Sequence, residues 1–96
     1  MLFKEAKKIL TDHKKDLFRF GVRALSLFGS VARNEGSSKN DVDILIDFDS
    51  KKGIFVFVSL RNYLEELLDC EVDLVTESAL HPALKRKILQ EAKYVF

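Results

Sequence analysis

Apolar residues recur at helical spacing at the start of the chain, with lysines between them. The stripe predicts an amphipathic helix from Leu2 to about Arg19, and Gly21 stands where a left-handed cap would end it. Its apolar members are Phe3, Ala6, Leu10 and Leu17.

Two further helices follow from the same spacing. One helix ends near Leu68. Its first residue is not determined by the spacing, because Ile54 to Val58 also has the propensity of a strand. The last is expected from near Pro82, an acceptable first-turn residue, through Val95. Its stripe consists of Ala83, Leu84, Ile88, Leu89, Ala92 and Val95.

Three shorter segments alternate apolar and polar residues, which is typical of strands. They are Val22–Phe28, Asp41–Phe48 and Glu71–Thr76. Between the first two, the segment from Val31 to Asn40 is predicted to be polar and flexible. The order of helix, strand, strand, helix, strand, helix indicates one α/β domain spanning residues 1–96.

Composition removes several functional classes. The 96 residues carry 16 basic and 15 acidic side chains, so general electrostatic attraction to nucleic acid is not expected. No apolar run approaches the roughly 18–20 residues of a membrane span. Cys70 is the one cysteine, so no internal disulfide can form. A cytoplasmic protein is predicted.

Candidate chemistry lies at the ends of the predicted strands. Gly29-Ser30 follows the first strand, where a glycine permits close approach of a phosphate and a serine can hold its oxygens. Asp41 and Asp43 share one face of the second strand. Two such close anions favour a neutralising cation, and magnesium prefers carboxylate oxygen. The alternative is an exposed pair on an edge strand.

Asp73 stands alone in the third strand. If the strands pair in one sheet, it joins Asp41 and Asp43. Three carboxylates could then hold two metal ions about 3.5–4 Å apart.

Gly29-Ser30, the ten residues Val31 to Asn40, and then Asp41-Val42-Asp43 match the signature of the DNA polymerase beta-like nucleotidyltransferase superfamily. With Val72-Asp73-Leu74-Val75, the chain resembles its minimal nucleotidyltransferase (MNT) family. Asn40 departs from the family's usual serine, and Asn supports similar turn hydrogen bonds.

The resemblance implies a short mixed sheet with helices packed on one side. It also implies that Gly29, Ser30 and Arg33 bind the nucleotide, with ATP as substrate. Asp41, Asp43 and Asp73 would hold two Mg²⁺ ions and act as the catalytic triad. For Arg33 and Glu35, an exposed turn pair remains the alternative to a direct role.

Kinship further points to a partner of the HEPN type, an RNase toxin that this chain would adenylylate on a tyrosine, as its antitoxin. Lys85-Arg86-Lys87, with Leu84 and Leu89, is one candidate docking face. Two alternatives stay open: an antitoxin that acts by binding alone, and a nucleotidyltransferase for small molecules such as antibiotics. The acceptor, the base and a homo-oligomeric state are not fixed by the sequence.

Overall fold

The computed structural model describes residues 1–35 and 41–96 and contains a four-stranded mixed sheet in the order β3-β2-β1-β4. β1 (Val22–Phe28) and β2 (Val42–Phe48) are antiparallel, and β3 (Val72–Thr76) runs parallel to β2. The short β4 (Lys93–Tyr94) pairs antiparallel with β1. All three predicted strands are confirmed. The glycine-serine centre of the predicted polar loop, residues 36–38, and Asn40 lie outside the described residues.

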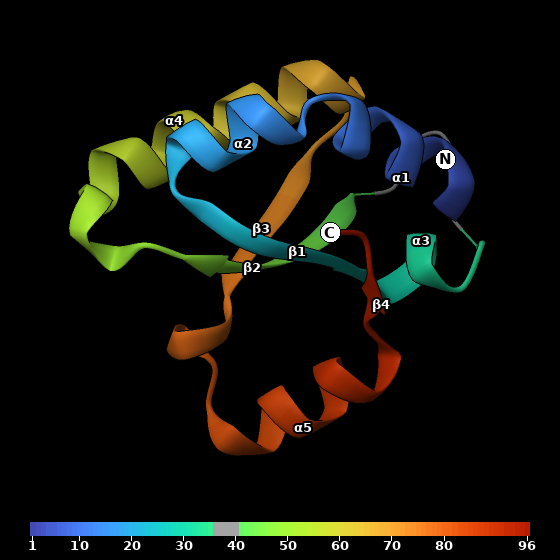
Figure 1. Ribbon diagram of the computed structural model, residues 1–96. Coiled ribbons are helices and arrows are strands. Elements are labelled where there is room, and N and C mark those ends of the chain that lie inside the picture. Colours follow the sequence, from blue (N-terminus) through green and yellow to red (C-terminus); the bar gives the residue numbers. More distant parts are fainter. Residues whose placement is uncertain (36–40) are drawn as a thin grey trace.

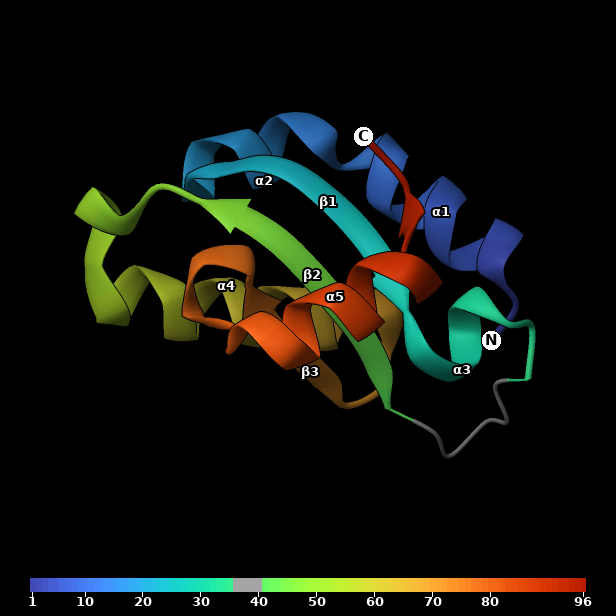
Figure 2. The same cartoon turned by 90° about the horizontal axis from the view of Figure 1, so that it is seen from below.

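Three helices cover one face of the sheet: α1 (Phe3–Asp12), α2 (Lys14–Phe20) and α4 (Gly53–Leu68) (Figure 1). The helix α5 (Pro82–Glu91) lies on the opposite side, as the view from below shows (Figure 2). The helices are therefore not all packed on one side. The short α3 (Gly29–Ala32) and the 3₁₀ turns η1 (Ser50–Lys52) and η2 (Glu77–Ala79) complete the described elements.

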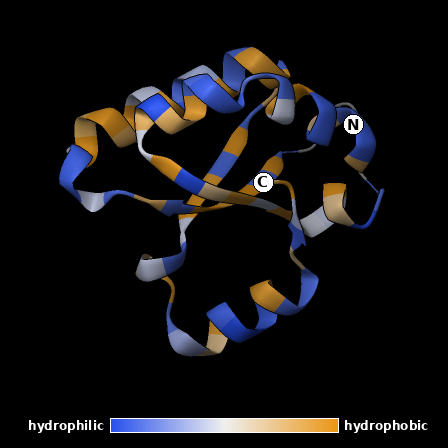
Figure 3. Ribbon diagram, viewed as in Figure 1, coloured by the Kyte–Doolittle hydropathy of each residue, from blue (hydrophilic) through white to orange (hydrophobic). Residues whose placement is uncertain are grey.

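The core lies between the sheet and the helices α1, α2 and α4. Burial of one leucine or isoleucine side chain in this core contributes about 1.5–3 kcal/mol to the free energy of folding. Apolar residues mark β1 and β2, whereas α5 is mostly hydrophilic and buries no side chain (Figure 3). The largest fully buried side chains include Leu10, Leu17, Leu25, Leu27, Ile44, Ile46, Leu60 and Leu64.

The first helix is broken where the sequence predicted continuity. His13 Nδ1–H donates to the Ile9 carbonyl at 2.8 Å, the acceptor that the His13 backbone N–H would use in a continuous helix. That N–H bonds to Leu10 instead, at 3.2 Å. Gly21 ends α2 with φ +104°, which confirms the predicted left-handed cap.

The other two helix boundaries also differ from expectation. α4 begins at Gly53, so the strand alternative for Ile54 to Val58 is wrong. The last helix ends at Glu91 rather than near Val95, because Lys93–Tyr94 forms β4 beside β1. The chain end is then held by the Leu25 N–H, which donates to the Phe96 carbonyl at 2.9 Å.

None of the helices within the described ranges has both the length and the apolar character needed to cross a membrane.

Candidate active site

Strand register brings two of the predicted carboxylates together. Asp43 on β2 lies directly opposite Asp73 on β3. Both project from the face that is not packed against the core, since their neighbours Val42, Ile44 and Val72 are buried. The condition stated from the sequence, that these strands pair in one sheet, is met, and Asp73 lies beside Asp43.

The Gly29 backbone approaches the same carboxylate from β1. Phe28 is opposite Asp43 in the β1–β2 register, and Gly29 follows it with φ +67°. A Cβ placed on Gly29 would overlap Asp43 Oδ2 and would lie 3.0 Å from its Cγ. Glycine is required here both by the positive φ and by this close approach.

The electrostatics of Asp43 reflect this crowding. Burial, followed by the negative charges of Asp73 and Asp41, raises the pKa of Asp43 to about 6. A hydrogen bond with Asp73 adds to the shift, and the charge of Arg33 partly offsets it. The site therefore holds more negative charge than its own residues neutralise.

The carboxylates at and around Asp43 offer only oxygen atoms as ligands, which suits magnesium. Asp41 stands just before β2 and is exposed, as is Asp73. Within the described ranges, no three acidic, histidine or cysteine side chains are already gathered as a closed metal cluster. Magnesium usually keeps several waters and takes phosphate oxygens from the substrate, so an open set of carboxylates fits it.

Ser30 lies in α3, a one-turn helix that the sequence did not predict. Val31 and Ala32, expected in a polar flexible segment, are each 1% exposed and anchor this turn to the core. The turn is closed by the Glu35 N–H, which donates to the Ser30 carbonyl at 2.8 Å. Ser30 itself remains partly exposed.

Arg33 is held by carboxylates at the end of α3. Its Nε donates to Glu35 Oε2 at 2.9 Å, and one terminal nitrogen lies 3.5 Å from Glu91 Oε1 on α5. The sequence predicted Arg33 and Glu35 as an exposed turn pair or as direct participants, but did not predict the contact with Glu91, because no local pattern indicates that α5 returns to α3. Asn34 was also missed: its Oδ1 accepts from the Phe3 N–H at 2.9 Å and ties α3 to α1.

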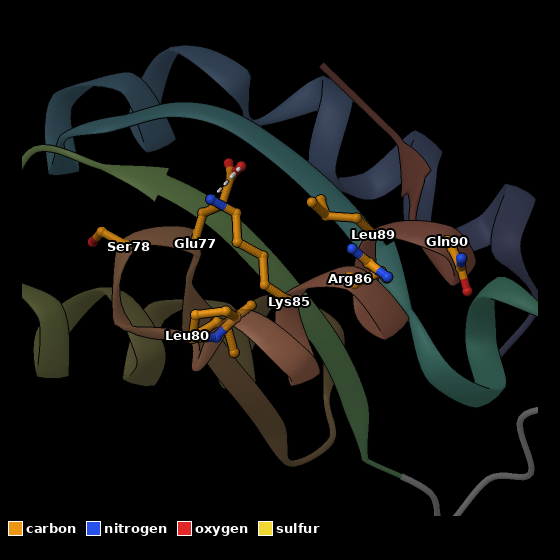
Figure 4. A pocket seen from close by; sticks show the side chains of 8 residues that line it. Glu77, Ser78, Leu80, Lys85, Arg86, Leu89 and Gln90 are labelled. Atoms are coloured by element: carbon orange, nitrogen blue, oxygen red, sulfur yellow. Dashed lines mark ion pairs between the residues drawn. The ribbon is translucent and has the colours of Figure 1, made fainter.

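One hollow lies at the carboxylates, and a larger one lies at the predicted docking face. The first, of about 370 Å³, includes Asp41, Asp73 and Phe57 in its lining. The larger one, of about 660 Å³, lies between η2 and α5 (Figure 4). Lys85 and Arg86 of the predicted docking face line the larger hollow, where Lys85 Nζ lies 3.8 Å from Glu77 Oε1. The carboxylate site is thus separate from the larger hollow.

Comparison with known proteins gives consistent matches. Residues 4–95 match the family model described as the nucleotidyltransferase domain. Protein adenylyltransferase MntA of Thermococcus cleftensis is 44% identical over 96 residues, covering 99% of this chain and 97% of the relative. A relative in Methanocaldococcus jannaschii is 40% identical over 93 residues, with 95% of each chain covered. A solved minimal nucleotidyltransferase superposes with a TM-score of 0.84 at 31% identity, covering 97% of this chain and 95% of the other.

Proposed function

Because this chain belongs to the nucleotidyltransferase domain family, we propose that it transfers AMP from ATP to a hydroxyl of a partner protein. The observation that carries the proposal is the in-register pair Asp43 and Asp73, with the Gly29 backbone directly beside it. The 44% identity to a protein adenylyltransferase over nearly the whole chain supports the choice of a protein acceptor.

In the proposed reaction, Gly29 and Ser30 hold triphosphate oxygens. Asp41, Asp43 and Asp73 are the residues that would hold two magnesium ions. When bound, magnesium supplies charge neutralisation at the triphosphate and at the attacking hydroxyl. Asp73, beside the acceptor, favours loss of the hydroxyl proton.

The bond changes balance without another reactant. The acceptor oxygen forms a bond to the α-phosphorus, and the bond from that phosphorus to the bridging oxygen of pyrophosphate breaks. The products are the adenylylated protein, pyrophosphate and the released proton. Positioning and charge compensation provide most of the catalysis for such an in-line transfer.

The proposed acceptor is a tyrosine on a HEPN-type RNase toxin, with this chain as its antitoxin. One solved structure with the same fold is a complex of an MNT antitoxin with the tri-AMPylated HEPN toxin of Shewanella oneidensis, with a TM-score of 0.72 at 19% identity. Another is a toxin–antitoxin complex with AMP-PNP, at 21% identity. These assemblies support a partner of this type and ATP as donor.

Intact-mass analysis tests the proposal directly. The product of the gene adjacent to this chain's gene is co-expressed with the wild type, with the Asp41→Asn plus Asp43→Asn double variant, or with Asp47→Asn. Asp47 is an exposed β2 aspartate paired with Arg23 at 3.6 Å and serves as the matched control. We expect an added AMP with the wild type and Asp47→Asn, and none with the double variant. If the double variant neutralises the partner equally well and no AMP is ever found, the chain acts by binding alone.

Calorimetry tests the metal requirement separately. We expect ATP to bind in the presence of magnesium and far more weakly in the presence of a chelator, because Asp41 and Asp43 otherwise repel the triphosphate. Equal affinity under both conditions would contradict a metal-bridged nucleotide.

A further inference from the structure

We propose that the outer edge of β3 binds an extended segment of the acceptor protein as an added strand and presents its hydroxyl beside Asp73. This inference rests on the proposed function and adds how the acceptor is held. β3 is the outermost strand of the sheet and pairs with β2 on one side only.

The backbone of β3 offers an open row of hydrogen-bonding groups. The Val42 N–H donates to the Glu71 carbonyl at 2.9 Å, so the backbone N–H and C=O groups of residues 71, 73 and 75 point toward β2. The backbone groups of residues 72, 74 and 76 consequently point outward, because the backbone groups of successive residues in a strand point to opposite edges. Glu65 Oε2 accepts from the Val72 N–H at 3.0 Å.

The next two outward N–H groups, of Leu74 and Thr76, have no hydrogen-bond partner within residues 1–35 and 41–96. The ligand that matches such a row is another extended polypeptide backbone. The edge therefore selects a protein segment rather than a small molecule.

Side-chain hollows follow the same edge. The 370 Å³ hollow that contains Asp41 and Asp73 is also lined by Phe57 and Arg61 of α4. A second hollow of about 340 Å³, largely apolar, begins where the first ends, since Phe57 lines both. Its other lining residues are Phe48, Ser50, Gly53, Ile54, Thr76 and Ala79.

The apolar hollow lies beside the first turns of α4, which are orange at the left of Figure 3. Ile54 and Phe55 there are 67% and 86% exposed, and adjoining exposed apolar side chains of this kind form a contact surface for another protein. A segment paired with β3 would reach the carboxylates at one end and this apolar surface at the other. We therefore expect an apolar side chain in the acceptor a few residues from the modified hydroxyl.

Strand geometry also limits which hydroxyl can react. A strand added outside β3 would place one side chain beside Asp73, with the two Cβ atoms about 5 Å apart. Asp43 lies one strand further, about 4.8 Å beyond. The proposed triphosphate site is at Gly29 and Asp43, so the hydroxyl must extend past the Cβ of Asp73 toward Asp43 to reach the α-phosphorus. The long phenol of a tyrosine can do this, whereas serine and threonine carry their hydroxyl too close to their own backbone.

Thr76→Pro tests the edge without touching the carboxylates. Proline removes the outward N–H, and Thr76 has φ −91° and ψ 141°, a conformation close to that of proline in an extended chain. Thr76→Val keeps the N–H and is the matched control. With the HEPN-type product of the adjacent gene as acceptor, we expect Thr76→Pro to slow AMP transfer at least about tenfold and Thr76→Val to change it less than about twofold. Affinity for ATP with magnesium should be the same in both variants.

Hydrogen–deuterium exchange of the wild type provides a second readout, which decides the question even if Thr76→Pro fails to fold. The Leu74 and Thr76 amides should gain protection when the acceptor is added. Equal transfer by both variants, or acceptor binding without protection of these amides, would overturn the proposal. So would a wild-type dimer that Thr76→Pro dissociates without slowing transfer, because a second copy would then occupy the edge. If the wild type transfers no AMP, the proposed function itself fails.

Discussion

Replacing Asp43 with asparagine should stabilise the metal-free protein at neutral pH. The pKa of Asp43 is raised from 3.8 to about 6 by burial and by Asp73 and Asp41. A folded-state pKa above the unfolded value means that the folded state binds the proton more tightly. Folding therefore becomes less favourable as pH rises from about 4 to about 6, while Asp43 loses its proton.

The size of the effect follows from that shift. About two pKa units correspond to about 3 kcal/mol, and solvent screening at this partly exposed carboxylate reduces the expected value to about 1–2 kcal/mol. Asparagine keeps the shape and removes the charge. In chelator at pH 8, we expect Asp43→Asn to exceed the wild type by this amount in its free energy of unfolding, and the difference to fade below about pH 4.

Urea unfolding at several pH values measures this difference. Asp47→Asn is the matched control. It removes an exposed ion pair with Arg23, at 3.6 Å, and should lower the free energy of unfolding by no more than about 1 kcal/mol. Excess magnesium should stabilise the wild type and not Asp43→Asn, since a ligand of the folded state raises its stability. A wild type that is as stable as Asp43→Asn at pH 8, or a difference that is independent of pH, would refute the reasoning.

Three further substitutions separate the contributions to the site. Gly29→Ala should lower the free energy of unfolding by about 1–3 kcal/mol and abolish ATP binding in calorimetry. Gly53 also has a positive φ, but no atom lies near the position of its Cβ, so Gly53→Ala should lower the free energy of unfolding by about 1 kcal/mol and leave ATP binding intact. Ser30→Ala should lower the transfer rate roughly ten- to a hundredfold with an unchanged unfolding midpoint, because one hydrogen bond to a charged phosphate is lost; an unchanged rate would contradict its role. Asp73→Asn should reduce kcat far more than ATP affinity, and an equal loss in both would place Asp73 on the nucleotide instead.

The carboxylate site was predictable because strand periodicity is local. Alternation in residues 41–48 and 71–76 places Asp41 and Asp43 on one face and turns Asp73 away from Val72 and Leu74. Periodicity alone left open whether these strands pair, and the register of β2 and β3 pairs them and sets Asp73 opposite Asp43. Gly29 followed from the same reasoning, since a glycine directly after a strand permits a close backbone approach.

The sequence by itself thus determined the three longer strands, the cap at Gly21 and the strand face on which each aspartate lies, because each depends on neighbours within a few residues. Only the tertiary structure decided that Lys93–Tyr94 leaves the helical pattern to pair with β1. The exposed stripe of α5 gains little from burial, whereas the open edge of β1 offers hydrogen bonds, so strand pairing prevails over helical periodicity. The contact of Arg33 with Glu91 and the open edge of β3 likewise depend on how distant segments fold back, which no local pattern encodes.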